Sequence, residues 1–127
     1  MITIDYTDRT PIYEQIVHSI ERLIALGVLV PEEKLPTVRT LGIELSTNHN
    51  TIQKAYALLE QRGTIYSVKG IGNFVSKIDL KTKMTEETLE LAHKNLQTAV
   101  LYGLTEAEFD QWIETQRREF YDHRNED

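Results

Sequence analysis

Apolar residues recur every three or four positions in the first part of the chain, and this spacing predicts short amphipathic helices. The first stripe covers residues 12–24 and predicts a helix that stops at Gly27. Thr10 is its expected N-cap, with Pro11 at the first helical position, where the missing N–H of proline costs nothing. Before it, the alternating residues 1–8 predict either an edge strand or a packed arm.

A loop and a second helix are expected next. The stretch VPEEKLPTVR (residues 30–39) holds two prolines, and each one pushes the residue before it toward extended geometry. A short helix is then predicted from about residue 37 to residue 45, with Val38, Leu41 and Leu45 facing inward.

The third predicted helix begins in STNHNTIQKAY, where six polar residues precede the apolar stripe. Asn48 is the expected N-cap. One side of this helix is apolar, and the helix ends at Gly63. The opposite side carries Asn50, Gln53, Lys54, Ala57 and Gln61.

Two short strands are predicted in TIYSV and NFVSK, joined by the glycine-rich turn KGIG. Three helices followed by a hairpin, with a tight join between the second and third helices, are the layout of a winged helix-turn-helix. The predicted fold class is therefore mostly α with a small β-hairpin wing. The winged helix-turn-helix is expected at residues 1–78 and a short two-helix tail at residues 79–127.

The tail is expected to join two copies of the chain. Residues 80–87 predict a linker, residues 85–102 a helix ended by Gly103, and Thr105 with Glu108 a capping box for a second helix. Two amphipathic helices of this length cannot form their own core, so their apolar faces need a partner surface. A ligand pocket is the less favoured use of the aromatic stripe. The expected dimer-interface residues are Leu89, Leu96, Val100, Phe109, Trp112, Ile113 and Phe120.

The distribution of charge also changes at the boundary between residues 78 and 79. The net charge is −6 over 127 residues, yet residues 1–78 hold eight basic and eight acidic side chains, so residues 79–127 account for all of it. An acidic total argues against binding to nucleic acid, where phosphate contacts dominate the affinity. It does not exclude such binding, because the local field of one face matters more than the sum.

Composition and motifs exclude several other classes. An apolar content of 40% suits one compact domain with a small appendage, and the absence of cysteine excludes disulfides and thiolate metal sites. Residues 1–10 lack the features of a signal peptide, and no apolar run approaches the roughly 20 residues of a membrane span. A cytoplasmic location without membrane contact is expected. No catalytic set, cofactor motif or metal-ligand spacing is present, so neither an enzyme nor a cofactor is expected.

Four segments together resemble the DNA-binding domain of GntR-type bacterial transcription regulators: PIYEQIV, LPTVRTLGIEL, NTIQKAYALLEQRG and IYSVKGIGNFVS. The short two-helix tail is similar to that of the YtrA subfamily. The resemblance implies a homodimer that places its third helices in successive major grooves of operator DNA, with the wings beside the backbone or minor groove. It also implies the DNA-binding residues Arg39, His49, Asn50, Thr51, Gln53, Lys69 and Gly70. Lys54 is expected to add a phosphate contact beside them.

Several of these positions also have a simpler interpretation. Asn50 and Gln53 can belong to a solvated helix face, and Arg39 can pair with Glu44 or Glu60. Gly70 can serve the hairpin turn alone. The sequence also departs from the family pattern. Ser46 stands where a glycine is usual, and His49 and Gln53 stand where arginine or a similar donor is common.

The expected function is therefore sequence-specific transcription regulation by a homodimer on a palindromic operator. Repression by occlusion of the promoter is the simplest mechanism, and the resemblance implies transporter genes as a plausible target. A small-molecule effector of unknown identity would act on the tail or on a hinge near Lys81. The alternative is a winged-helix module that binds proteins and not DNA.

Overall fold

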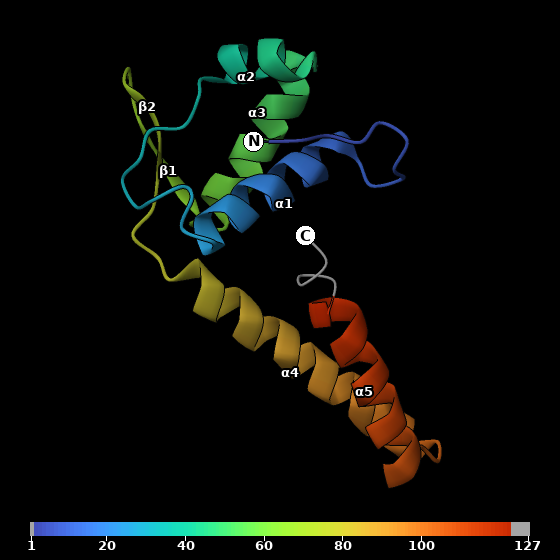
Figure 1. Cartoon of the computed structure of the whole chain (residues 1–127). Helices are drawn as coiled ribbons and strands as arrows, with labels where there is room; N and C mark the ends of the chain where they lie inside the picture. Colours follow the sequence, from blue (N-terminus) through green and yellow to red (C-terminus); the bar gives the residue numbers. More distant parts are fainter. Residues whose placement is uncertain (1, 123–127) are drawn as a thin grey trace. The chain divides into compact units, whose positions relative to one another are not determined.

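The computed structural model describes residues 2–122, and the chain divides into two compact units, Met1–Met84 and Thr85–Asp127. The first unit contains three helices and a hairpin in chain order, and the second contains most of one long helix and all of another (Figure 1). This order confirms the mostly α winged helix-turn-helix followed by a two-helix tail. Among the described residues, no helix is both long and apolar enough to cross a membrane.

Helix α1 (Ile12–Ala25) begins one residue later than expected, because Pro11 and not Thr10 is its N-cap. The prediction of a Thr10 side-chain cap is wrong, since no side chain caps this helix. The backbone of Thr10 is used instead: its carbonyl accepts a hydrogen bond of 2.9 Å from Nε2 of Gln15. Gly27, with a φ of 78°, follows the helix end as predicted.

The helix-turn-helix consists of α2 (Val38–Leu45) and α3 (His49–Gln61). Thr37 caps α2, and Asn48 caps α3 as predicted, with its Oδ1 accepting from the Asn50 N–H at 2.7 Å. Ser46 lies between the two helices in the left-handed region, at φ 50° and ψ 44°. The turn therefore keeps the conformation that glycine would adopt easily, although serine adopts it at a cost.

The hairpin consists of β1 (Ile65–Val68) and β2 (Gly72–Val75), paired antiparallel. Part of the predicted loop at residues 30–39 also pairs with β2. The sequence predicted only a loop here and gave no sign of this pairing. The N–H groups of Glu32 and Leu35 donate to the carbonyls of Val75 and Asn73, at 2.8 and 2.9 Å. The wing is therefore held on both edges of β2.

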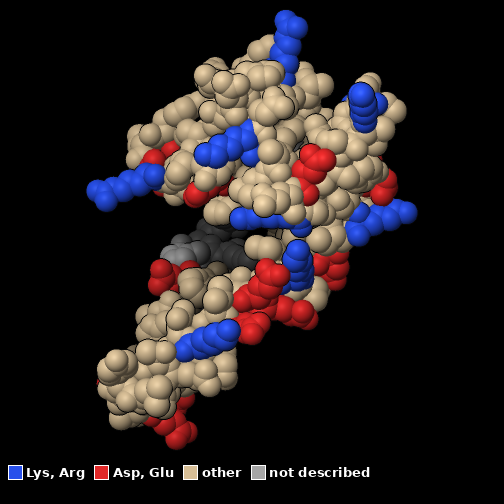
Figure 2. Space-filling view, turned by 180° about the vertical axis from the view of Figure 1, so that it is seen from behind, with Lys and Arg blue, Asp and Glu red and all other residues tan. Residues whose placement is uncertain are grey.

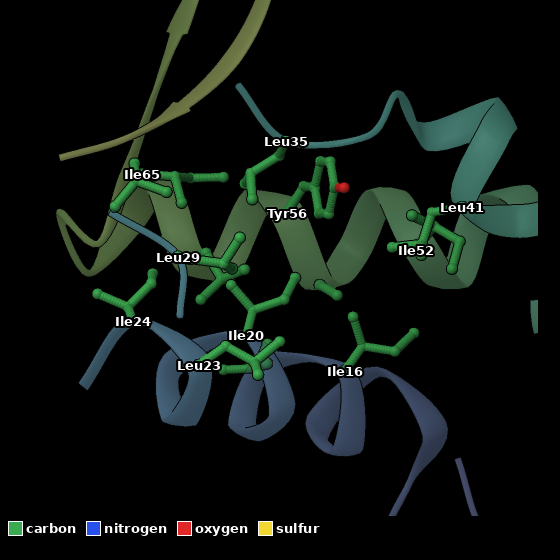
Figure 3. Close-up of a cluster of buried hydrophobic side chains, with 14 of the residues drawn as sticks. Ile16, Ile20, Leu23, Ile24, Leu29, Leu35, Leu41, Ile52, Tyr56 and Ile65 are labelled. Atoms are coloured by element: carbon green, nitrogen blue, oxygen red, sulfur yellow. The ribbon is translucent and has the colours of Figure 1, made fainter. Parts of the chain in front are cut away.

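The core of the first unit lies between α1 and α3. Figure 3 shows Ile16, Ile20 and Leu23 of α1 pointing toward α3. The predicted inward face of α3 is confirmed, because its four apolar residues are all buried. These residues are Ile52, Ala55, Tyr56 and Leu59.

One charged group is buried beside this core. Glu21 is 6% exposed, and its carboxylate accepts from Arg62 Nη1 at 2.8 Å and from Thr64 Oγ1 at 3.2 Å. A buried carboxylate is tolerated only when it is paired and hydrogen-bonded, and both conditions hold here. The network joins α1 to the residues that follow α3.

In the tail, α4 (Leu80–Leu101) includes the segment that the sequence predicted as a linker. The helix starts early because Asp79 accepts hydrogen bonds from the backbone N–H and the hydroxyl of Thr82, at 3.2 and 2.7 Å, and because Leu80 is buried. The expected hinge near Lys81 falls in the first turn of α4, close to the boundary between the two units at Met84 and Thr85, and it stays a prediction. Helix α5 (Glu106–Tyr121) has the predicted capping box, in which Thr105 and Glu108 bond reciprocally and these bonds lower the pKa of Glu108.

Candidate nucleic-acid interface

The first turns of α3 present a row of polar side chains to solvent. His49, Asn50 and Gln53 are exposed, and the spacing of three places Asn50 and Gln53 on the same face of the helix. Within residues 2–122 neither the Asn50 nor the Gln53 side chain forms a hydrogen bond. Their amide groups are therefore free to bind a partner molecule.

The opposite face of α3 is firmly anchored. Ile52 is fully buried, and the Tyr56 hydroxyl donates to the Pro36 carbonyl at 2.7 Å. Burial, and then the charge of Glu44, raise the pKa of Tyr56 well above its ordinary value, so the phenol stays protonated and remains a donor. The Asn48 cap fixes the start of the helix. The exposed amides therefore project from a rigid support, which a site of defined geometry needs.

Lys54 and Thr51 lie on the flanks of this row. The Lys54 Nζ is 4.0 Å from the centroid of the Tyr13 ring, a cation–π contact that holds its long side chain against α1. Lys54 remains exposed, whereas Thr51 is half-buried. The contact orders a cation beside the amide row, and so reduces the side-chain entropy that binding would otherwise cost.

Arg39 lies on the first turn of α2 and is exposed. Neither Glu44 nor Glu60 forms an ion pair with it in the described part of the chain. The salt-bridge alternative for Arg39 is therefore not realised in this structure, and its guanidinium is available to a phosphate or a base.

The wing tip presents Lys69 and Gly70. Gly70 has a φ of 78°, so it serves the geometry of the turn whether or not it also touches DNA. Lys69 is exposed beside it. Figure 1 shows the wing tip and the α2–α3 turn at the same end of the first unit.

Lys34 is a candidate that sequence reasoning missed. The pairing of residues 32–35 with β2 places its side chain across Gly72, where an added Cβ would lie 2.9 Å from Lys34 Cε. The only sequence signal is the glycine at position 72, which permits this close approach. Two basic side chains therefore lie at the wing: Lys69 at its tip, and Lys34 on the loop that pairs with β2.

Charge over the first unit is mixed. Figure 2 shows Lys and Arg side chains projecting at several separate places, with acidic side chains between them. On this surface single Lys or Arg side chains could each contact a phosphate, but they do not form a continuous basic patch. Among the described residues, no three His, Asp or Glu side chains are grouped so that they could hold a metal ion.

The residues expected at a dimer interface lie on a largely uncovered apolar surface of the second unit. Leu96 and Phe109 are half-buried, and the others are exposed. A hollow of about 800 Å³ in this unit is lined by side chains of α4 and by Phe109. Its lining includes Leu96, Gln97, Val100 and Leu101.

Known proteins are similar to this chain in sequence and in fold. Residues 12–75 match the family described as bacterial regulatory proteins, gntR family. The chain is 36% identical over 117 residues to the HTH-type transcriptional repressor YtrA of Bacillus subtilis, and the alignment covers 89% of each protein. A GntR family transcriptional regulator from Listeria monocytogenes matches with a TM-score of 0.68 and 31% identity, over 88% of this chain and 98% of the other. The DNA-binding domain of AraR, solved in complex with an operator, matches with a TM-score of 0.52 and 32% identity, over 60% of this chain and 93% of its own.

Proposed function

The chain belongs to the GntR family of bacterial regulatory proteins, as a short member similar to the YtrA repressor, and we propose that it represses transcription as a homodimer bound to a palindromic operator. Membership in this family makes it a DNA-binding transcription regulator and not an enzyme. The proposal goes beyond family membership in three respects: the protein forms a dimer, its operator is palindromic, and it represses transcription.

The observation that supports the proposal most is the exposed, unpaired amide row of Asn50 and Gln53 on an anchored helix. Asparagine and glutamine can each form two hydrogen bonds to adenine N6 and N7 in the major groove. Arg39, Lys54 and Lys69 would contact phosphates on either side and set the register of α3 in the groove. His49 and Thr51 would add contacts at the start of the helix, and Gly70 would let the wing approach the backbone closely.

The tail would supply the dimer. In this proposal residues 1–78 bind DNA and residues 79–127 dimerise through the apolar surface that includes Leu89, Val100 and Trp112. A dimer of this kind would bind half-sites about one helical turn apart. Binding across a promoter would exclude RNA polymerase. The protein would act in the cytoplasm of the host cell, and transporter genes are its proposed target. An apolar effector in the hollow beside Phe109 would alter the dimer and hence the spacing of the two α3 helices.

The dependence of affinity on salt tests this function against the alternative of a protein-binding module. Arg39, Lys54 and Lys69 give six cations per dimer, so log Kd is expected to rise with log salt concentration with a slope of about 5. The measurement is fluorescence anisotropy with a labelled duplex of the promoter next to the gene, between low and physiological salt. Absence of duplex binding at low salt would favour the protein-binding alternative, which the zero net charge of residues 1–78 permits.

A further inference from the structure

The segment before α1 is tied by hydrogen bonds from Asp5 onward, although it contains neither helix nor strand. We call residues 2–10 the N-terminal arm. Gln15 of α1 holds the arm with its side-chain amide: Oε1 accepts from the Asp5 N–H at 2.8 Å, and Nε2 donates to the Asp5 carbonyl at 3.0 Å. Ile2 and Ile4 pack against the core. The arm is therefore a packed arm and not an edge strand.

The tip of the arm contacts the helix-turn-helix. The Tyr6 hydroxyl lies 3.0 Å from the Leu45 carbonyl, 3.3 Å from the Ser46 carbonyl and 2.8 Å from Thr47 Oγ1. The Tyr6 side chain is 63% exposed, so burial of its ring does not explain this position. What fixes it is the hydroxyl, whose one proton can be donated to the Leu45 carbonyl, the Ser46 carbonyl or Thr47 Oγ1 at the end of α2, where carbonyls lack partners within the helix. The Leu45 carbonyl also accepts from Thr47 Oγ1 at 3.1 Å, so the three groups form one small network.

The α2–α3 turn has a conformational cost that such a contact can offset. Ser46 is in the left-handed region, which a residue with a Cβ occupies at a cost that glycine avoids. Two residues later Asn48 caps α3, and two residues after that Asn50 begins the exposed amide row. Any change in the conformation of Ser46 or Thr47 therefore moves the start of α3.

We propose that Tyr6 is a positioning residue for DNA recognition, because its hydroxyl holds the α2–α3 turn in the conformation that aims the amide row of α3. The inference rests on the proposed function and adds the N-terminal arm to the DNA-reading unit. Tyr6 itself does not need to touch DNA.

The test uses the full-length chain with Tyr6→Phe, which removes the hydroxyl and keeps the ring. Without DNA, hydrogen exchange at the backbone amides of residues 46–50 is expected to become faster. Operator affinity is expected to fall about three- to tenfold, the equivalent of one or two lost hydrogen bonds, while affinity for unrelated duplex stays within about twofold. Tyr102→Phe removes a phenol hydroxyl from the second unit, at a residue that is 89% exposed, and is the control.

A double-mutant cycle assigns the effect to the contact. Thr47→Val removes the hydroxyl that lies opposite Tyr6, and the double variant is expected to lose less operator affinity than the sum of the two single losses. Additive losses, or unchanged exchange at residues 46–50 in Tyr6→Phe, would overturn the proposal. If the unmodified protein binds no operator, the proposed function fails, and the exchange measurement still decides whether Tyr6 holds the turn.

Discussion

Replacing Asn50 and Gln53 together by alanine is expected to abolish most of the preference for operator over unrelated DNA. Both side chains are exposed and without internal hydrogen bonds, so their removal leaves the fold intact. Each bidentate contact to adenine is worth about 1–3 kcal/mol of discrimination, so the pair should cost about 30-fold to 10⁴-fold in operator affinity. Binding to unrelated duplex should change little, because phosphate contacts supply it.

The measurement is a pair of titrations, one with operator duplex and one with a shuffled duplex of the same length. Gln61→Ala is the matched control, since Gln61 is an exposed amide at the far end of α3. Equal loss of affinity for both duplexes in the double variant would show that Asn50 and Gln53 contribute to non-specific DNA binding and not to sequence recognition. An operator loss in Gln61→Ala of the same size would show that the location on α3 does not matter.

Truncating Ile52 to alanine is expected to have the largest effect on stability. Ile52 is fully buried among the residues that join α3 to α1 and α2, and this change typically lowers the free energy of unfolding by about 2–5 kcal/mol. The free energy is measured by urea denaturation followed by circular dichroism, at one fixed protein concentration because dimerisation would also contribute.

Ile43→Ala is the control for this truncation. Ile43 is 70% exposed on α2, so the same loss of atoms should change the free energy of unfolding by no more than about 0.5 kcal/mol. A small effect at Ile52, or equal effects at the two positions, would contradict the packing of α3 against the core. Loss of DNA affinity in Ile52→Ala is expected to follow the unfolded fraction alone.

The sequence predicted the elements whose signals are local. The spacing of apolar residues located α1 and α3, and short polar residues at the right places identified the Asn48 cap and the capping box of Thr105 and Glu108. The glycine-rich turn located the hairpin. Each of these signals lies within a few residues of the feature that it predicts, which is why reading along the chain is sufficient.

Features that depend on distant contacts were not predictable in the same way. The pairing of residues 32–35 with β2 joins segments about 40 residues apart, and the proline content of the first segment indicated only a loop. The early start of α4 depends on burial of Leu80. The sequence did not indicate this burial, because the residues after Leu80 are mostly polar and predicted a linker. Tyr6 contacts a turn 40 residues later through one hydroxyl, and no periodicity can indicate such a contact.

The sequence of α3 was enough to propose the amide row. Once the spacing of its apolar residues identifies the buried face of the helix, the same helical repeat assigns the polar residues to the opposite face. The basic residues around it were harder to judge from sequence. The structure shows that Lys54 is held over Tyr13 and that the Lys34 side chain lies against Gly72 of the wing, which only the tertiary fold determines. Whether these side chains contact DNA stays a proposal.

We propose that the exposed start of α3 reads base edges in two symmetric half-sites. Selection of bound oligonucleotides from a random pool by the full-length protein at low salt tests it most directly. We expect an enriched two-fold symmetric consensus, with half-sites about one helical turn apart and an A·T pair in each half. The preference for this A·T pair should be lost when Gln53→Ala and Asn50→Ala are combined. Recovery of a pool without any enriched sequence would contradict it.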